Sequence, residues 1–330
     1  MRKHVVVANR TILPQGVDIL KEAFEVTVID GMREQAMIDA VGEHGAEALF
    51  VRMEPVTRRV LESCPTLKVV QVHGIGVDNV DTDAASERGI MVLNLPGSNS
   101  TAVAEQAMTM MFALSRDMIF QDRVARGEVA ARPRNFTILE GKNLFILGLG
   151  NIGGRVARKM GGIGMNVRAY DKYLGAEVMR KRGAEKVEDP DEGFVWADIV
   201  SMHVPLTKET RHMVSAHEIG LMKKTAFLIN TARGDVVDED ALYAALTGGG
   251  IAAAGIDVFA VEPIDAEHNP FLALDNVVLA SHCGGASVEN MPRPSTWGAA
   301  AIVSVLKGEM PGDNLFNREQ LRALGTLAGV

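Results

Sequence analysis

Cysteine is scarce in this chain, with only Cys64 and Cys283 among 330 residues. Two cysteines provide no disulfide framework, so a reducing compartment is the natural expectation. The N-terminal segment MRKHVVVANR has a basic start but an apolar core of only three valines, which is too short for a secretory signal. We therefore expect a cytoplasmic protein.

Uninterrupted apolar segments and an excess of positive charge are also missing. The apolar segment Thr101 to Leu114 is interrupted by Glu105 and Gln106, so it is not expected to span a membrane. The formal net charge of −8 and the pI of about 5.6 argue against nucleic acid or an anionic membrane as a partner, although a local basic pocket for a small anion is compatible with them. The 47% apolar content and the length of 330 residues fit a globular protein of two domains.

A glycine-rich turn lies near the middle of the chain, in KNLFILGLGNIG over residues 142–153. Gly148, Gly150 and Gly153 follow an apolar run and precede a helix-compatible stretch. Such glycines permit a tight turn, a close approach to pyrophosphate and close helix packing. Asp171 ends the next apolar run, where a carboxylate can accept hydrogen bonds from an adenosine ribose. The pattern predicts a Rossmann dinucleotide-binding unit. The alternative is an ordinary βα turn with Asp171 as a helix cap.

Short strand-like runs alternate with helix-like segments in both halves of the chain, which predicts two mostly parallel sheets covered by helices. The strand-like runs of the first half are Val5–Ala8, Val26–Ile29, Ala48–Val51, Leu67–Val70 and Ile90–Leu93. Those of the second half are Leu144–Leu147, Val167–Tyr170, Ile199–His203, Ala226–Asn230, Ala253–Asp257 and Val277–Ala280.

Several other segments give expectations of their own. Methionines recur at helical spacing over Val103–Met118, which predicts a long helix with a methionine-rich core face. The polar segment Gly127–Gly141 is expected to cross into the second domain. Thr296–Leu306 predicts one more helix, and the last two dozen residues resemble a tail. Gly255, inside a strand-like run, indicates close approach by a ligand or a neighbouring element.

Three chemically active residues follow successive strand-like runs of the second half: Arg233, Glu262 and His282. Ligands of an open parallel sheet bind beyond the carboxyl ends of its strands, so we expect the three side chains to converge beside the nucleotide. A histidine can give and take the proton that accompanies hydride transfer. A carboxylate beside the imidazole fixes the ring, and an arginine fork matches a substrate carboxylate.

Each of these residues also has a structural interpretation. A histidine at a strand end is more often structural than catalytic, and Arg233 could simply pair with Asp235. Glu262 precedes Pro263 and could be a solvated turn residue. The three together, at the expected end of a nucleotide-binding sheet, favour the catalytic interpretation.

Segments spread along most of the chain match the pattern of one enzyme family. They are LKVVQVHGIGVDNVD, ILGLGNIG, VSMHVPLTKETRHMV, LINTARGDVVDEDAL, GIDVFAVEP and SHCGGAS. Together they resemble the NAD-dependent D-2-hydroxyacid dehydrogenases, the family that contains D-3-phosphoglycerate dehydrogenase. This combination is far more specific than a glycine fingerprint alone.

The resemblance implies that Arg233 binds the substrate carboxylate, that Glu262 orients the histidine and that His282 is the acid/base. With the glycine fingerprint, it also implies a set of cofactor contacts: Gly148, Gly150, Asn151, Ile152, Gly153, Asp171, Pro205, Thr210, Thr231, Ala232, Arg233, Asp257, His282, Gly284 and Gly285. The expected cofactor is NAD(H), because the carboxylate of Asp171 would repel the 2′-phosphate of NADP. Lys172 beside it is a mild counterweight.

Two segments of the first half are implied in substrate binding. The loop Gly74-Ile75-Gly76 would hold the substrate carboxylate with backbone N–H groups, or is a simple strand-ending turn. Arg52 stands where phosphoglycerate dehydrogenases carry an arginine for the substrate phosphate. Met53 and Glu54 depart from the family pattern, and an acid would repel a phosphate. The alternative is that Arg52 forms a surface ion pair with Glu54.

The resemblance implies an α/β fold of two doubly wound parallel-sheet domains. A Rossmann NAD-binding domain, residues 101–290, would be inserted into a discontinuous flavodoxin-like substrate domain, residues 1–100 and 291–330. Two linker helices would form a hinge, and the helix Val103–Met118 would contribute to a homodimer. Because the chain ends near residue 330, we expect no C-terminal regulatory domain. No metal is expected. A second departure from the family is that Ser281 and Cys283 flank His282.

The leading hypothesis is therefore an oxidoreductase that interconverts a 2-oxoacid and a D-2-hydroxyacid, such as D-3-phosphoglycerate or another anionic or sugar-derived acid. A different class is an NAD(H)-sensing, corepressor-like scaffold with little turnover. A third option is a related enzyme with an inorganic substrate such as phosphite. Ile75 stands where that subfamily has a lysine, which argues against it.

Overall fold

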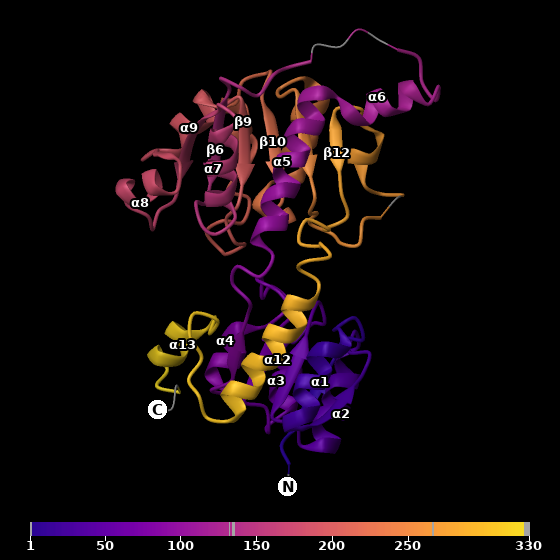
Figure 1. Cartoon of the computed structure of the whole chain (residues 1–330), viewed down its shortest axis with the longest axis vertical. Coiled ribbons are helices and arrows are strands. Elements are labelled where there is room, and N and C mark those ends of the chain that lie inside the picture. The colour runs from indigo at the N-terminus through magenta and orange to yellow at the C-terminus, as the bar shows by residue number, and fades with distance from the viewer. Residues whose placement is uncertain (1, 132, 134–135, 266, 327–330) are drawn as a thin grey trace. The chain divides into compact units, whose positions relative to one another are not determined.

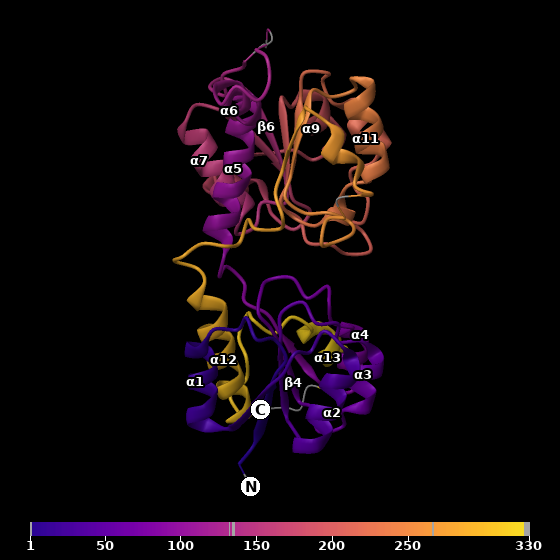
Figure 2. The same ribbon diagram turned by 90° about the vertical axis from the view of Figure 1, so that its right-hand side faces the viewer.

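The computed structural model describes residues 2–131, 133, 136–265 and 267–326. The chain divides into two compact units (Figures 1 and 2). Unit 1 comprises Met1–Asn99 and Ser287–Val330, and unit 2 comprises Ser100–Ala286. The prediction that Gly127–Gly141 crosses between domains is wrong, because this segment lies inside unit 2. Within the described ranges, no helix is long and apolar enough to span a bilayer.

Unit 1 is built on a five-stranded parallel sheet with the strand order β2-β1-β3-β4-β5. Its strands are β1 (His4–Val7), β2 (Glu25–Val28), β3 (Ala48–Val51), β4 (Val69–Val72) and β5 (Met91–Leu93). Its helices are α1 (Pro14–Ala23), α2 (Glu34–His44), α3 (Arg58–Ser63), α4 (Thr82–Glu87), α12 (Pro292–Leu306) and α13 (Arg318–Ala323).

Helices cover both faces of this sheet, and alternate residues of a strand pack against opposite sides. On one side, Val6 packs in a cluster with residues of α2, α3 and α4. On the other, Val5 and Val7 pack with residues of α1 and α12, which lie side by side in both ribbon views. The sequence-distant helix α12 therefore completes the core that the first ninety or so residues begin.

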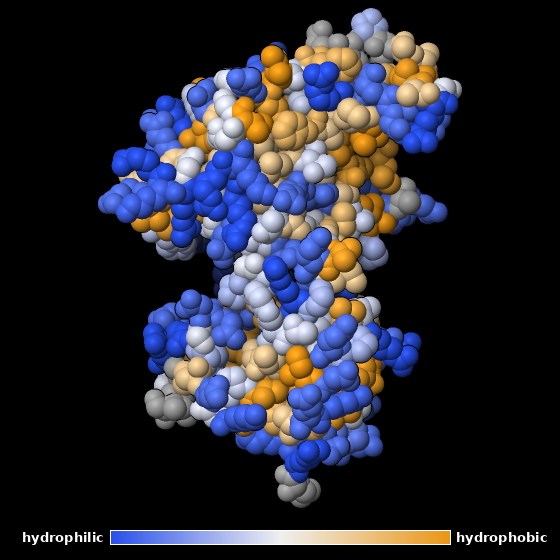
Figure 3. Space-filling model, in the orientation of Figure 1, coloured by the Kyte–Doolittle hydropathy of each residue, from blue (hydrophilic) through white to orange (hydrophobic). Residues whose placement is uncertain are grey.

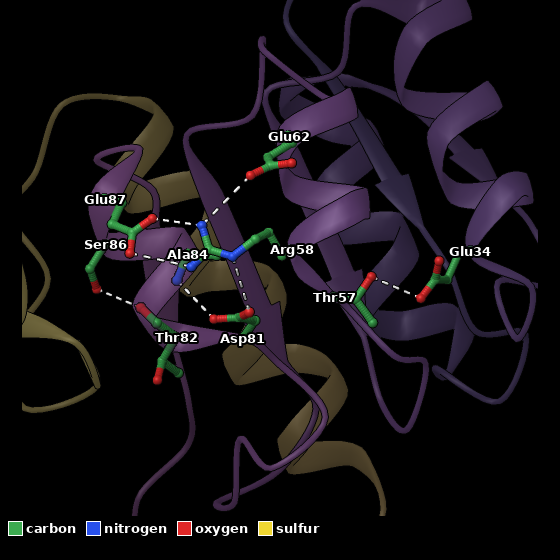
Figure 4. A network of polar contacts seen from close by, with 9 residues as sticks. All are labelled: Glu34, Thr57, Arg58, Glu62, Asp81, Thr82, Ala84, Ser86 and Glu87. Atoms are coloured by element: carbon green, nitrogen blue, oxygen red, sulfur yellow. Dashed lines mark hydrogen bonds and ion pairs between the residues drawn. The ribbon is translucent and has the colours of Figure 1, made fainter.

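An exposed ion-pair network joins two helices of unit 1 (Figure 4). Arg58 at the start of α3 donates from Nη1 to Glu87 at the end of α4 (2.7 Å), with Glu62 at 3.6 Å and Asp81 at 3.9 Å. Asp81 also accepts from the amide of Ala84 (2.8 Å), which caps α4. Exposed pairs of this kind contribute little to stability. They leave the Arg58 guanidinium surrounded by carboxylates.

Unit 2 is built on a seven-stranded parallel sheet with the order β12-β11-β10-β9-β6-β7-β8. Its strands are β6 (Asn143–Leu147), β7 (Asn166–Tyr170), β8 (Glu185–Lys186), β9 (Ile199–Met202), β10 (Phe227–Asn230), β11 (Ala253–Ile256) and β12 (Val277–Leu279). Its α-helices are α5 (Ser100–Arg116), α6 (Met118–Ala125), α7 (Gly153–Gly162), α8 (Ala176–Lys181), α9 (Pro190–Trp196), α10 (Ala216–Leu221) and α11 (Glu239–Gly248). Two 3₁₀ turns, η1 (Gly234–Val236) and η2 (Pro270–Ala273), complete the unit.

The predicted fold class, two parallel-sheet α/β bodies with the second inserted into the first, is confirmed. The long helix predicted over Val103–Met118 is confirmed as α5, which begins earlier, at Ser100, and ends at Arg116. The left-handed backbone of Asp117 (φ 50°) separates α5 from α6. The packing role predicted for the methionines holds for Met110 and Met111, which are buried. A Cβ on Gly255 would lie 2.9 Å from Met110 Cβ, so the close approach there is made by α5.

The C-terminal segment is more ordered than expected. Helix α12 begins at Pro292 rather than Thr296, and α13 forms where a tail was predicted. Asn317, almost fully buried, donates to Ser86 Oγ and Ile90 O at 2.9 and 3.0 Å. These contacts anchor α13 beside α4, which local sequence pattern could not reveal. Residues 327–330 of the predicted tail lie outside the described residues.

Candidate active site

The glycine turn between β6 and α7 has the geometry that its spacing predicts. Gly148 has a positive φ of 86°, and a Cβ there would lie 2.9 Å from Val204 Cγ1. A Cβ on Gly153 would lie 2.1 Å from the carbonyl oxygen of Gly148. A Cβ on Gly150 would meet nothing within 4 Å. The first and third glycines are therefore required by packing, and the second borders open space.

Backbone donors are available at the same turn. Within the described part of the chain, the amides of Gly150, Asn151 and Ile152 have no hydrogen-bond partner. They stand at the start of α7, where unpaired N–H groups and the helix dipole favour an anion. This arrangement fits a pyrophosphate.

Asp171, directly after β7, accepts a hydrogen bond from the glycine turn. Its Oδ2 accepts from the amide of Leu149 (3.0 Å), and its Oδ1 accepts from the amide of Tyr173 (3.0 Å). The alternative of a helix cap is wrong, because α8 begins five residues later, at Ala176. The neighbouring Lys172 forms an exposed ion pair with Glu209.

The loops after β9 and β10 contain five further predicted cofactor contacts: Pro205, Thr210, Thr231, Ala232 and Arg233. Thr210 Oγ1 donates to the carbonyl of Pro205 (2.6 Å), which fixes the first loop. In the second, Asn230 Oδ1 accepts from the amide of Ala232 (3.0 Å). Thr231 is buried, and its hydroxyl has no hydrogen-bond partner among the described residues. A buried hydroxyl left in this state fits a polar ligand that supplies the partner.

Arg233 follows in the same loop. Asn230 Nδ2 donates to its carbonyl (2.9 Å), and its own Nη1 donates to the carbonyl of Ala232 (2.7 Å). Asp235, the structural alternative as its partner, forms an ion pair with Arg211 (2.6 Å).

His282 and Glu262 are in direct contact. His282 Nδ1 lies 2.6 Å from Glu262 Oε2, and the amide of Phe259 donates to Glu262 Oε1 (2.9 Å). Burial raises the pKa of Glu262, but the hydrogen bonds from His282 and Phe259 and the nearby charges outweigh it, so the pKa lies below the ordinary value. An ionised carboxylate can only accept, so Nδ1 carries the hydrogen and Nε2 is left to exchange a proton. The alternative of a solvated turn glutamate is wrong.

The backbone that carries His282 is held by Asp257. His282 has a left-handed φ of 54°, and its amide donates to the Asp257 carbonyl (2.7 Å). The buried Asp257 carboxylate accepts from the amides of Cys283 (3.0 Å) and Gly284 (2.9 Å). Gly285 lies in the same turn. Unfavourable backbone at a chemically active residue persists only where its surroundings enforce it. Sequence reasoning assigned Asp257 to the cofactor and missed this holding role.

The predicted substrate residues of the first half lie in unit 1. After β4, the carbonyls of Gly74 and Ile75 accept from Leu95 N (2.8 Å) and Asn94 Nδ2 (2.7 Å). The amides of Gly74, Ile75 and Gly76 have no partner within the described ranges. The loop is thus fixed through its carbonyls, while its donors stay available.

Arg52, directly after β3, is exposed, and its Nη1 donates to Thr11 Oγ1 (3.0 Å). The alternative of a surface ion pair with Glu54 is wrong. Glu54 is only 1% exposed, and its Oε2 accepts from the backbone amide of Arg52 (2.6 Å). The carboxylate is turned into unit 1. Local sequence pattern does not reveal this orientation, because one of its donors, Asn9, lies 45 positions away.

Comparison with known proteins agrees with this geometry. Residues 108–284 match the family model described as D-isomer specific 2-hydroxyacid dehydrogenase, NAD binding domain. The chain is 40% identical over 303 residues to a D-3-phosphoglycerate dehydrogenase of Methanocaldococcus jannaschii, covering 91% of this chain but 57% of that protein. It is 37% identical over 329 residues to a glyoxylate reductase of Korarchaeum cryptofilum, covering 96% of this chain and 97% of that one.

Among solved structures, a D-lactate dehydrogenase from Aquifex aeolicus complexed with NAD and lactic acid superposes with a TM-score of 0.81. The two chains are 26% identical, and the match covers 97% of this chain and 98% of the other. The protein belongs to the D-isomer specific 2-hydroxyacid dehydrogenase family. It is a nicotinamide-dependent oxidoreductase by that membership, and unit 2 contains the matched nucleotide-binding segment.

Proposed function

We propose that this protein interconverts a 2-oxoacid and a D-2-hydroxyacid with NAD(H), using Arg233, Glu262 and His282. The observation that carries the proposal is the 2.6 Å contact between His282 Nδ1 and Glu262 Oε2, in the same unit as the glycine turn. Family membership indicates the class of reaction, and this contact supports His282 as the acid/base.

A bound nicotinamide supplies or accepts the hydride. During reduction, His282 donates the proton from Nε2 to the carbonyl oxygen, and it takes the proton back in the reverse direction. Glu262 fixes the ring and stabilises its charged form, because the carboxylate lies at hydrogen-bond distance from Nδ1. Arg233 holds the substrate carboxylate, and this fixes the adjacent carbonyl for reaction.

The cofactor residues proposed from the sequence stay as predicted. The Gly150, Asn151 and Ile152 amides suit the pyrophosphate, and the Thr231 hydroxyl suits a polar group of the nucleotide. Two features support NAD over NADP. Asp171 places a carboxylate at the end of β7, where a 2′-phosphate would be repelled, and the charge of Lys172 is paired with Glu209.

We further propose that unit 1 binds the rest of the substrate. The amides of Gly74, Ile75 and Gly76 would hold a carboxylate, and Arg52 would bind an anionic substituent. The named relatives act on different acids, phosphoglycerate and glyoxylate. An exposed arginine favours the acid with a second anionic group, so D-3-phosphoglycerate or a sugar-derived acid is the substrate class we propose.

We also propose a homodimer formed through α5 and α6. Apolar side chains gather on the face of unit 2 that carries these helices (Figure 3). Phe112, Met118 and Ile119 are 42%, 51% and 57% exposed, which is unusual for such large apolar groups on neighbouring turns. Sedimentation of the purified chain tests this, and a monomer at micromolar concentration contradicts it.

The decisive experiment follows NADH absorbance with phosphohydroxypyruvate, hydroxypyruvate, glyoxylate, pyruvate and sugar-derived oxoacids. We expect oxidation of NADH with at least one of them, and loss of that activity in His282→Ala. Tight NADH binding without turnover of any oxoacid contradicts the proposal and favours the sensing scaffold.

A further inference from the structure

A closed ring of hydrogen bonds joins two loops at the carboxyl end of the unit 1 sheet. The ring contains Asn9 and Thr11, after β1, and Arg52 and Glu54, after β3. Arg52 N donates to Glu54 Oε2 (2.6 Å), and Asn9 Nδ2 donates to Glu54 Oε1. Thr11 Oγ1 donates to Asn9 Oδ1 (2.5 Å), and Arg52 Nη1 donates to Thr11 Oγ1 (3.0 Å). Adjacent parallel strands β1 and β3 bring the two loops together.

The ring depends on a buried charge. Glu54 is 1% exposed, and its carboxylate accepts from N–H groups of Asn9, Arg52 and Met53, the last at 3.2 Å. Burying a carboxylate is costly unless hydrogen bonds satisfy it, and removing its donors or the charge itself disturbs every group that it holds. Here those groups are the backbone of Arg52 and the side chain of Asn9.

Arg52 and Arg58, both in unit 1, differ in the groups that surround their guanidinium groups. Arg58 is surrounded by the carboxylates of Glu87, Asp81 and Glu62 (Figure 4). Arg52 donates from its side chain to a neutral hydroxyl, and the neighbouring Glu54 carboxylate accepts from the Arg52 backbone amide. Its exposed guanidinium therefore keeps most of its donors and its full charge for a ligand.

We propose that Glu54 is a positioning residue, which together with Asn9 and Thr11 fixes the Arg52 guanidinium to read a carboxylate or phosphate on the substrate. The inference rests on the proposed function, because it assumes that Arg52 binds substrate. Glu54 itself does not touch the substrate. It selects the acid with a second anionic group by holding the arginine in one orientation, which reduces the entropy lost on binding.

The test compares two 2-oxoacids that differ in one group: hydroxypyruvate, and phosphohydroxypyruvate with its phosphate. Oxaloacetate supplies a second carboxylate in place of the phosphate. Steady-state kcat/KM is measured for the wild type, Glu54→Gln, Thr11→Val, Arg52→Ala and the double variant of Arg52→Ala with Glu54→Gln. Arg58→Gln is the matched control, because it removes an arginine of the same unit that lies outside the ring.

We expect Glu54→Gln and Thr11→Val to lower kcat/KM for an anionic oxoacid by roughly tenfold relative to hydroxypyruvate, mostly through KM. Arg52→Ala should lower it further. Adding Glu54→Gln to Arg52→Ala should leave the substrate ratio unchanged, since the glutamate acts through the arginine. Arg58→Gln should keep the wild-type ratio, and the Kd for NADH should be constant throughout.

Several results overturn the inference while leaving the proposed reaction standing. One is an equal loss for all oxoacids in Glu54→Gln and Thr11→Val, which indicates a structural role only. Another is that Arg52→Ala changes the ratio of kcat/KM between the anionic oxoacid and hydroxypyruvate, while Glu54→Gln and Thr11→Val leave this ratio at the wild-type value. A third is a wild type that has no preference between the substrates, or an Arg52→Ala variant that keeps the wild-type preference. Thr11 is exposed, so its variant keeps the test valid if Glu54→Gln fails to fold. Absence of turnover with every oxoacid instead contradicts the proposed function itself.

Discussion

At the carboxyl end of the unit 1 sheet, the buried carboxylate of Glu54 accepts the amide of Arg52 (2.6 Å). At the carboxyl end of the unit 2 sheet, the buried carboxylate of Asp257 accepts the amides of Cys283 (3.0 Å) and Gly284 (2.9 Å). In both units a buried acid fixes the loop that presents a basic side chain. The acid's charge is satisfied by N–H groups rather than by that side chain.

The two basic side chains differ in their own partners. Arg52 Nη1 donates to a hydroxyl, that of Thr11, whereas His282 Nδ1 lies 2.6 Å from a second carboxylate, that of Glu262. A partner that can stabilise extra positive charge suits a group that gains and loses a proton. A neutral partner suits a group whose charge never changes. The comparison therefore agrees with the roles that we propose, a reacting histidine in unit 2 and a binding arginine in unit 1.

The largest expected effect comes from removing the reacting group. We expect His282→Ala to lower turnover by roughly 10²–10⁴-fold, because general acid–base catalysis contributes about that much. The Kd for NADH should change little, since the glycine turn is untouched. Stopped-flow turnover and fluorescence titration check the two halves of this prediction. Near wild-type turnover would remove the histidine from the mechanism.

The next effect is a loss of folding stability at low pH, caused by one buried histidine in each unit. Burial, helped by the charge of Arg52, lowers the pKa of His73 in unit 1 to about 4. Burial lowers the pKa of His203 in unit 2 to about 3. The unfolded chain binds these protons at higher pH than the folded chain does. Stability is therefore full above about pH 6.5 and falls as the pH drops towards those values.

For His73 the loss amounts to about 3 kcal/mol between pH 6.5 and pH 4, as an order of magnitude. His73→Gln should remove that part of the slope, and His203→Gln should do the same for unit 2. Urea unfolding at a series of pH values measures both. An unchanged slope in His73→Gln would show that its imidazole is charged in the folded protein.

A smaller effect, about 10- to 100-fold in kcat, is expected for Asp257→Asn. An amide oxygen can replace one carboxylate oxygen but not both, so one of the Cys283 and Gly284 amides loses its acceptor. The histidine turn should loosen without unfolding. Steady-state kinetics together with a thermal melt separate the two effects. Wild-type kcat in a folded variant would show that the turn does not need this carboxylate.

The smallest effect concerns cofactor choice. We expect catalytic efficiency with NADH to exceed that with NADPH by at least about tenfold, through repulsion between Asp171 and the 2′-phosphate. Asp171→Asn should reduce the preference. The same substitution weakens the acceptor of the Leu149 amide, so NADH binding serves as the control. Equal efficiencies in the wild type would refute the assignment of Asp171.

The sequence predicted the two α/β bodies because parallel strands and their helices leave strong local patterns. Most strand ends agree within one residue, although Leu67–Val70 is displaced by two, to Val69–Val72. The docking of α13 was missed because it depends on the contacts of Asn317 with Ser86 and Ile90, which are distant in sequence. The break at Asp117 was missed because a left-handed residue inside a helix-like segment leaves the apolar spacing unchanged. β8, only two residues long, was too short to leave a pattern.

In the candidate site, too, the features with a local sequence pattern were predicted, and those that depend on sequence-distant contacts were missed. Spacing and family pattern named His282, Glu262 and the glycine turn, whose geometry fits the proposed roles. Glu54 was interpreted as a residue that would repel an anion. Its actual orientation depends on Asn9, 45 positions away, which no periodicity connects to it. The holding role of Asp257 was missed for the same reason, since its amide partners lie on the loop after the next strand.

The most direct measurement is a crystal structure of the protein with NAD(H) and a bound 2-oxoacid or its unreactive analogue. The account predicts His282 Nε2 at hydrogen-bond distance from the substrate carbonyl oxygen, with Nδ1 still on Glu262 and the nicotinamide facing the carbonyl carbon. A closed, liganded complex with the imidazole out of reach of both the carbonyl oxygen and Glu262 would contradict it.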